Sequence, residues 1–348
     1  MHKGDAVRYG IGIAVLLAAG VLALVLSRAT EPAVHAAPSS GKKFSALLLD
    51  PLTVGQAGEI VAAGAGLFDR AGISMELKPA DTDPIEAVVD GKVAFGVVEA
   101  DSFLKAYAKG APIVSFGGAH LESEIVFFSR EFDRIYSPRE FPGKRVVRLG
   151  GSSSALVYDA VLRNTGISRS AVREMASGDI EDLAEGKVDV LPGRVTADSY
   201  LLKRRNLPFA VMRPGDYGVH IPGLVYFTTR KLLSDNPSVV LAFLKGVIAG
   251  WQAVYADVEK SVPLLVAAGG GKLDSDEVKF KLAIQREFVL PIGRRAVEFD
   301  DQQWRQLATL LRNARLIDGT TNMSEAVNYD LLKEAYRTPV TSTLIRGN

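Results

Sequence analysis

Two stretches of the sequence share one pattern: IEAVVDGKVAFGVVEADSFL at residues 85–104 and IEDLAEGKVDVLPGRVTADSYL at residues 180–201. Each stretch predicts a helix, a Gly-Lys-Val turn, a strand, a loop and a second helix that opens at Ala-Asp-Ser. The second stretch carries two extra residues in its strand and loop. In open α/β sheets, ligands bind where strands end and helices begin. The repeat therefore predicts two similar lobes that face one cleft, although two ordinary helix–strand units with a common glycine turn would also explain it.

Strands and helices alternate on both sides of this repeat, and each kind has its own spacing of apolar residues. Short apolar or alternating runs predict strands at 44–49, 73–78, 93–98, 124–129, 207–212 and 224–229. Helical patterns lie at 54–68, 84–90, 102–109, 155–164, 238–257, 259–268, 275–289 and 301–314. The alternation predicts an α/β fold with parallel or mixed sheets that helices cover.

The order of these elements predicts two lobes. Residues 42–125 and 226–348 are expected to form the first lobe, and residues 126–225 an inserted second lobe. The chain would cross between the lobes twice, and its C-terminal helices would pack on the first lobe.

The N-terminus has the pattern of an export signal. Lys3 and Arg8 precede an uncharged run at 11–26, and Val34-His35-Ala36 places small residues at a cleavage site. As a helix this run would span about 24 Å, short of the ~30 Å hydrocarbon core of a membrane. A signal peptide at residues 1–37 is therefore favoured, and an uncleaved membrane anchor remains the alternative. In both cases the rest of the chain is exported to the periplasm, and no other segment is expected to reach membrane length.

The composition excludes several classes of protein. The chain has 348 residues with 41 Lys and Arg and 40 Asp and Glu, so its net charge of +1 gives no basic footprint for nucleic acid. Because cysteine is absent, disulfides, thiolate metal sites and cysteine nucleophiles are excluded. Beyond the export signal lie His120 and His220, and neither has a metal-ligand spacing beside it. We therefore expect no metal and no cofactor.

Three stretches resemble a known family. They are residues 65–116, FPGKRV at 141–146 and NPSVVLAFLKGVIAGWQAVYAD at 236–257. Together they are similar to the solute-binding proteins of ABC importers, and within these to the NMT1/THI5-like group of nitrate, sulfonate, taurine and thiamine-pyrimidine binders. The resemblance implies a two-lobed periplasmic-binding-protein fold of type II, with two hinge crossovers and closure driven by a small-molecule ligand. It also implies an ABC permease and an ATPase as partners, and we expect a monomer.

The resemblance also favours one ligand. The loop Asp216-Tyr217-Gly218 and the following LVYFTTRKLL are more similar to the pyrimidine-binding branch than to the taurine or nitrate branch. The favoured ligand is therefore a thiamine-precursor-like aminopyrimidine. A sulfonate or nitrate-type anion is the alternative, as is a membrane-anchored solute sensor. The thiamine-pyrimidine synthases of this superfamily carry a cysteine-rich motif, and since this chain has no cysteine, we do not expect an enzyme.

Polar residues at strand ends and helix N-termini are expected to contact the ligand, because free backbone N–H groups accumulate there. The candidates are Asp50, Thr53, Gln56, Glu99, Ser152, Ser153, Ser154, Arg194, Asp216 and Tyr217.

Each candidate also has a structural interpretation. The segment 50–56 could be a simple turn, and one serine of 152–154 is expected to cap a helix. Glu99 is expected to face the ligand, whereas Asp101 is expected to cap the helix that follows it.

Arg194 is the second-lobe counterpart of Glu99. It could clamp an anion with two hydrogen bonds, or pair with Glu99 or Asp198 when no ligand is bound. Tyr217 could stack on a planar ligand and Asp216 could accept from an amino group, although a solvated turn would explain both. A buried charge without a partner is costly. Carboxylates and an arginine in one cleft therefore favour a neutral or zwitterionic ligand.

Overall fold

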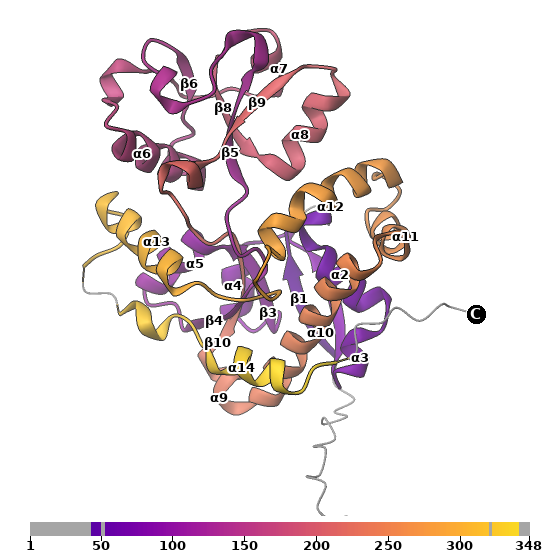
Figure 1. Cartoon of the computed structure of the whole chain (residues 1–348). Coiled ribbons are helices and arrows are strands. Elements are labelled where there is room, and N and C mark those ends of the chain that lie inside the picture. Colours follow the sequence, from indigo (N-terminus) through magenta and orange to yellow (C-terminus); the bar gives the residue numbers. More distant parts are fainter. Residues whose placement is uncertain (1–42, 50–52, 320–321, 341–348) are drawn as a thin grey trace, which may run out of the picture. The chain divides into compact units, whose positions relative to one another are not determined.

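The computed structural model describes residues 43–49, 53–319 and 322–340 (Figure 1). All of these lie in one compact unit, Ser40–Asn348. The predicted signal or anchor at 1–37 and the candidate Asp50 lie outside the described residues.

A five-stranded sheet forms the base of the first lobe. Its strands are β1 (Lys43–Leu48), β2 (Ser74–Pro79), β3 (Phe95–Glu99), β4 (Ile113–Gly118) and β10 (Leu224–Thr229). Their order in the sheet is β2-β1-β3-β10-β4. The pairs β1–β2 and β1–β3 are parallel, whereas β10 runs antiparallel to β3 and β4. Strand β10, which follows β9 in the chain, thus lies between β3 and β4 of this sheet.

The second lobe has two smaller sheets. In the first, β5 (Ile125–Arg130) lies between β8 (Leu191–Arg194) and β9 (Phe209–Met212), antiparallel to both. The other pairs β6 (Arg145–Val147) with β7 (Arg173–Met175) in parallel. Helices α6 (Ser153–Thr165), α7 (Ile180–Ala184) and α8 (Val195–Arg204) complete the lobe (Figure 1).

Two crossovers join the lobes and run beside each other. We define the first as residues 119–124 and the second as residues 213–223. The backbone N–H of His120 donates to the carbonyl of Leu224 at 3.0 Å, and that of Ser123 donates to the carbonyl of Ile221 at 2.9 Å. This backbone pairing makes the two connections one hinge.

The predicted helix at 54–68 is interrupted in the structure. It forms a short 3₁₀ turn, η1 (Val54–Gln56), then α2 (Ala57–Gly64) and α3 (Leu67–Arg70). Gly66 adopts a φ of +65° between α2 and α3, a left-handed conformation that glycine tolerates best. The glycine-rich helix was therefore predicted at the right place in the sequence, but the structure divides it into three short elements.

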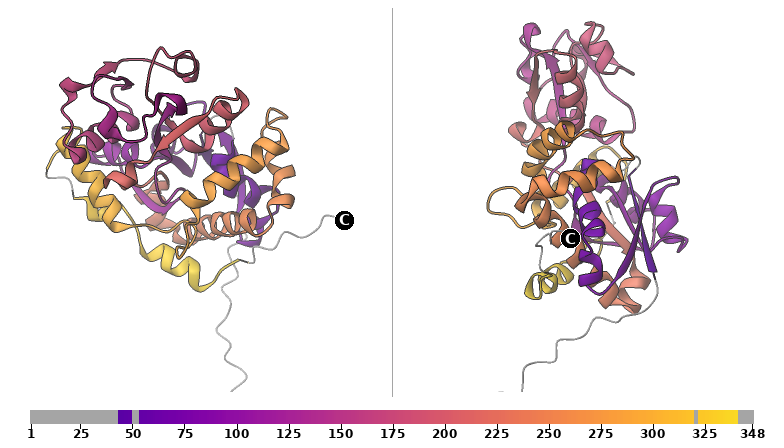
Figure 2. Two further views of the ribbon diagram at one scale, coloured as in Figure 1. Left: turned by 45° about the horizontal axis from the view of Figure 1, so that its top comes forward. Right: turned by 90° about the vertical axis from the view of Figure 1, so that its right-hand side faces the viewer.

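Helix α10 (Pro237–Ala256) is the central helix of the first lobe. Its Phe243 ring stacks on Phe95 of β3, with ring centroids 4.1 Å apart. A Cβ atom at Gly250 would overlap the carbonyl oxygen of Gly58 in α2, so glycine is what lets these two helices pack closely. Figure 2 shows this helix with α11 (Val258–Ala268) beside the five-stranded sheet.

By length and hydropathy α10 would also suit a membrane span, which corrects the expectation that no second segment reaches that length. Its most apolar 18-residue window has a mean hydropathy of 1.6, and 67% of that window is buried in the lobe. The burial explains the apolar composition, because a core helix is apolar all round.

Three further helices occur earlier in the chain: α4 (Pro84–Val89), α5 (Ala100–Ala108) and α9 (Arg230–Asp235). The C-terminal helices are α12 (Ser275–Val289), α13 (Asp301–Asn313) and α14 (Asp330–Arg337). They do not contact the first lobe alone. Tyr200 of α8 packs on Phe280 of α12 with ring centroids 5.5 Å apart, so α12 reaches the second lobe. Trp304 and Leu307 of α13 are buried in a cluster that includes residues of both α5 and α6.

Candidate functional site

The two halves of the repeat place one charged residue each where the lobes meet. Glu99 is the last residue of β3 and precedes α5, and Arg194 is the last residue of β8 and precedes α8. Neither side chain caps its own helix. The guanidinium of Arg194 forms an ion pair with the carboxylate of Glu99. The sequence suggested that Arg194 clamps an anion or pairs with an acidic residue, and the structure shows it paired with Glu99.

A second contact between the lobes lies beside the first. The Ser153 hydroxyl at the start of α6 donates to Oδ1 of Asp101 at 2.7 Å. The other oxygen of Asp101 is 2.9 Å from Nζ of Lys105. Asp101 is only 4% exposed, so this contact is largely shielded from water.

The expected capping role of Asp101 is wrong. Helix α5 begins at Ala100, earlier than predicted, because the chain turns directly from β3 into the helix. Glu99 holds the cap position with an extended backbone, and Asp101 lies inside the first turn. From there its carboxylate points to the second lobe instead of to its own backbone.

The serine loop divides its roles. Ser152 caps α6, since its Oγ accepts from the backbone N–H of Ala155 at 3.2 Å. Ser153 reaches Asp101 of the other lobe, and Ser154 lies 2.8 Å from the Ser152 hydroxyl. One serine thus caps the helix and another spans the lobes.

Thr53 and Gln56 form a closed turn. The side-chain Oε1 of Gln56 accepts from the Thr53 backbone N–H at 2.9 Å, and Thr53 Oγ1 accepts from the Gly55 backbone N–H at 3.2 Å. This reciprocal capping box uses both side chains, and Gln56 is 1% exposed. The turn interpretation therefore describes these two residues, and their contact with a ligand stays a prediction.

Two further acidic residues contact the backbone at Arg194 and Val195. Asp198 accepts from the backbone N–H of Arg194 at 2.7 Å. Glu124 ends the first crossover, and its backbone carbonyl accepts from Val195 N–H at 3.0 Å. The charge of Glu99 does most to raise the pKa of Arg194, and the charges of Glu124 and Asp198 add to it. Burial is the main cause that raises the pKa of Asp198.

Glu124 was not predicted as a site residue. It opens an apolar run that predicts a strand, and it is 5% exposed in the structure. His120 Nδ1 lies 3.3 Å from Oε1 of Glu124, which is an ion-pair distance, although this oxygen accepts no hydrogen bond. A lone glutamate at the start of an apolar strand was the available signal, because such a charge is rarely buried without a role.

His120 is a structural residue of the hinge. Its Nε2 lies 3.0 Å from the carbonyl oxygen of Gly55 and 3.3 Å from the amide of Gln285. It thereby joins the first crossover to η1 and α12. Among the described residues, no group of three His, Cys, Asp or Glu side chains could hold a metal ion.

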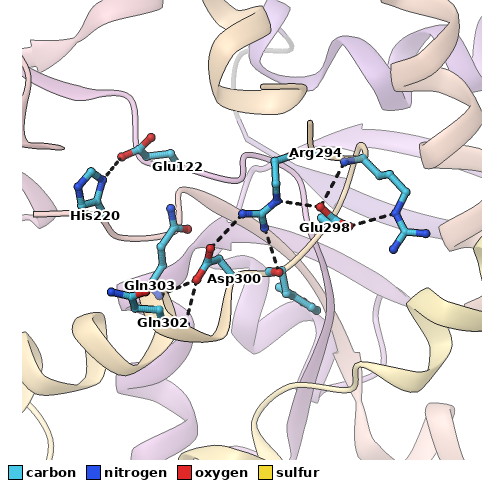
Figure 3. Close-up of polar contacts among 9 residues, drawn as sticks. Glu122, His220, Arg294, Glu298, Asp300, Gln302 and Gln303 are labelled. Carbon is cyan, nitrogen blue, oxygen red and sulfur yellow. Dashed lines mark hydrogen bonds and ion pairs between the residues drawn. The ribbon is translucent and has the colours of Figure 1, made fainter. Parts of the chain in front are cut away.

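Asp216 and Tyr217 lie at the hinge and not at the Glu99–Arg194 pair. Asp216 lines a cavity of about 210 Å³ together with Glu122 and His220. His220 Nδ1 of the second crossover lies 3.0 Å from Glu122 Oε1 of the first (Figure 3). The backbone carbonyl of Tyr217 accepts from Asn164 of α6 at 3.0 Å.

A separate ion cluster fixes the loop that joins α12 to α13. Arg294 contacts Glu298 at 2.8 Å and Asp300 at 3.0 Å (Figure 3). Asp300 also caps α13 by accepting from the N–H groups of Gln302 and Gln303. The charged groups of this cluster pair with one another, and Asp300 also caps α13. We therefore assign the cluster a structural role and do not treat it as a candidate site.

The model of the NMT1/THI5-like family matches residues 54–261. The chain belongs to the NMT1/THI5-like family. No curated protein matches the sequence.

Solved structures resemble this NMT1/THI5-like protein along most of its length. The periplasmic aliphatic sulphonate binding protein SsuA of Escherichia coli has 18% identity and a TM-score of 0.67 over 88% of this chain and 94% of its own. A ligand-binding component of an ABC-type import system from Staphylococcus aureus, solved with zinc bound, has 14% identity and a TM-score of 0.65 over 85% and 100%. The desulfurization enzyme DSZB has 13% identity and a TM-score of 0.60 over 84% and 99%.

At these identities the likeness shows the fold alone. The NMT1/THI5-like chain has the two-lobed periplasmic-binding-protein fold of type II, as its sequence predicts. Its structural neighbours are mostly binding components of ABC importers, several of them named as periplasmic or sulfonate-binding proteins.

Proposed function

We propose that this protein is the periplasmic solute-binding component of an ABC importer. Residues 1–37 would export the chain or anchor it to the inner membrane. A monomer with lobes 42–125 plus 226–348 and 126–225 would deliver its solute to a permease and an ATPase. One observation carries the proposal: equivalent strand ends of the two repeat halves, Glu99 and Arg194, meet between the lobes. Solved ABC import components share this fold, which supports it.

Solute binding would act through the contacts between the lobes. Glu99 pairs with Arg194 and Asp101 with Ser153, one residue from each lobe in both cases. A solute between the lobes would offer its own donors and acceptors to these four groups. It would favour the closed form only as far as it binds that form more tightly than the open one. The permease would then distinguish loaded from empty protein by the lobe arrangement.

The favoured solute is a thiamine-precursor-like aminopyrimidine. Glu99, Glu124 and Asp198 lie around Arg194, so carboxylates outnumber guanidinium groups at this point. Amino groups and protonated ring nitrogens are hydrogen-bond donors, and a carboxylate is an acceptor. An anion would have to approach three carboxylates to reach one arginine.

A sulfonate or nitrate-type anion is the second candidate. The names of several solved neighbours favour it, since these are called sulfonate-binding proteins. In this chain Arg194 and the serine hydroxyls would be its donors, and Arg194 would have to leave Glu99.

We do not propose catalysis. A general base must lie within reach of the proton that it removes. Glu99 and His220 could each act as a base, but they are paired with Arg194 and with Glu122 in different parts of the molecule. One neighbour is named as an enzyme, so a turnover assay with each bound solute belongs in the test.

Thermal unfolding of the purified protein against a panel of solutes tests the proposal. A solute at 100 times its dissociation constant should stabilise the folded state by about 2.7 kcal/mol. We expect a saturable shift with an aminopyrimidine, no turnover of it, and slower uptake of that solute by cells that lack the protein. Normal uptake in such cells would contradict a role in import, whichever solute binds.

A further inference from the structure

The charges of three carboxylates from different parts of the fold act on the guanidinium of Arg194. Glu99 comes from β3 of the first lobe, Glu124 from the first crossover and Asp198 from α8 of the second lobe. Glu99 forms the direct ion pair, and the charges of the other two also act on the guanidinium. These carboxylates therefore surround a cationic group, the guanidinium of Arg194.

The negative charge here exceeds the positive charge. The nearest lysines are already used, because Lys105 is 2.9 Å from Asp101 and Lys281 is 2.5 Å from Glu277. Lys281 also acts on Asp198 but is itself paired with Glu277, so the three carboxylates face two cations, Arg194 and Lys281. Burial without sufficient compensation also disfavours the charge of Asp198.

A second observation comes from Glu124 itself. Its side chain is 5% exposed, and its Oε1 accepts no hydrogen bond. A buried carboxylate oxygen without a donor costs free energy. His120 Nδ1 lies 3.3 Å from this oxygen without forming a hydrogen bond, so the oxygen can accept one from a solute.

The solvent exposure of the two side chains indicates that Arg194, and not Glu99, is the partner that can move away. The side chain of Arg194 is 40% exposed, whereas that of Glu99 is 18% exposed. Arg194 forms no side-chain capping bond to α8, so its guanidinium can leave Glu99 without breaking a cap of its own helix.

We propose that the guanidinium of Arg194 occupies the subsite of the solute's own cationic group, and that the solute carries a planar N–H donor cation such as an amidinium, a guanidinium or a protonated aminopyrimidine. Planar donors fit because two parallel N–H groups match the two oxygens of a carboxylate. On binding, the solute's donors replace Arg194 on Glu99, and Arg194 turns outward. This inference rests on the proposed solute-binding function and specifies its ligand class.

Removal of Arg194 then has an unusual expected effect. If Arg194 competes with the solute, Arg194→Ala vacates the subsite and tightens the binding of a planar cation. A partly exposed ion pair contributes up to about 1 kcal/mol, so the gain in affinity is about fivefold. If Arg194 instead clamps an anion, the same substitution abolishes binding of that anion.

Isothermal titration of the full exported chain distinguishes these outcomes. The probes are benzamidine, methylguanidine and a 2-methyl-4-aminopyrimidine, with ethanesulfonate, taurine and nitrate as the anionic set. The variants are Arg194→Ala, Arg194→Gln and Glu99→Gln. Arg205→Ala is the matched control, because Arg205 follows the same helix and forms an exposed ion pair with Glu181.

We expect at least one planar cation to bind the wild type, to bind both Arg194 variants about fivefold more tightly, and to lose affinity in Glu99→Gln. Unfolding curves of each variant check that it is folded. Weaker binding of the cation in Arg194→Ala and Arg194→Gln would overturn the inference, and so would the absence of cation binding in every variant. An anion that binds only when Arg194 is present would also overturn it, but would leave the solute-binding function standing.

Discussion

Arg194 and Glu99 hold equivalent positions in the two halves of an internal repeat, and they form an ion pair with each other across the lobes. Each is the residue at which a strand becomes a helix. The repeat thus does more than duplicate a fold unit, because it brings two residues of opposite charge to one point.

This ion pair should couple the two lobes only weakly when no ligand is bound. Both partners retain contact with solvent, so the coupling free energy from a double-mutant cycle of Glu99→Gln and Arg194→Ala should be about 0.5–1 kcal/mol. Urea unfolding of the four proteins measures it. A coupling above about 3 kcal/mol would mean that the pair is a buried structural bridge and not an openable contact.

Two adjacent serines should behave differently. Ser152→Ala removes the cap of α6 and should lower the free energy of unfolding by about 1 kcal/mol. Ser153→Ala removes the hydrogen bond to Asp101 and should open the lobes with little loss of stability, since Asp101 keeps Lys105. Unfolding curves and small-angle scattering compare the pair. Equal stability losses and equal scattering profiles would argue against this division of roles.

The close packing of α2 on α10 should not tolerate a methyl group. Gly250→Ala would place Cβ against the carbonyl oxygen of Gly58, which is backbone and cannot turn away. We expect a loss of about 2–3 kcal/mol in the free energy of unfolding. Gly150→Ala is the control, because its Cβ meets nothing within 4 Å. A neutral Gly250→Ala would show that the helices separate easily.

Glu59 should make the protein less stable as the pH rises. Burial raises the pKa of this carboxyl from 4.5 to about 7, although its own backbone N–H and the Tyr226 hydroxyl oppose the change. Neither carboxyl oxygen has a hydrogen bond of normal geometry. Because the folded state holds the proton longer than the unfolded state, stability from this group is complete below pH 4.5 and falls by about 3 kcal/mol up to pH 7.

Glu59→Gln tests this assignment because it keeps the shape and removes the charge. The variant should match the wild type near pH 4.5 and be more stable than it at pH 8. Urea unfolding at both pH values measures the difference. Parallel pH profiles for the two proteins would show that Glu59 does not titrate in this range.

The fold could be predicted from the sequence because its elements are strongly patterned. Strand β10 was expected at 224–229 and found there, and α12 was expected at 275–289 and found there. Short elements such as β7 and α14 were missed, since three or eight residues carry little periodicity. The break at Gly66 was missed because propensity alone does not show where a helix with several glycines divides.

The candidate site was predictable only in part. The positions of Glu99 and Arg194 follow from the repeat, because each is the last residue of a strand that leads directly into a helix. Asp101 was assigned to a cap because the helix start was placed two residues too late. The placement of Asp216 at the hinge cavity depends on how the second crossover folds, and no local pattern encodes that.

Titration of a 2-methyl-4-aminopyrimidine into the wild type, Glu99→Gln and Glu181→Gln tests the central claim, that the Glu99–Arg194 contact is the solute site. Glu181 is the matched control because it belongs to the same repeat and forms an exposed ion pair with Arg205. A hydrogen bond to a charged group contributes about 1.5–3 kcal/mol, so Glu99→Gln should weaken binding by at least about tenfold. Glu181→Gln should bind like the wild type. Equal affinities in all three proteins would place the solute elsewhere and contradict this account.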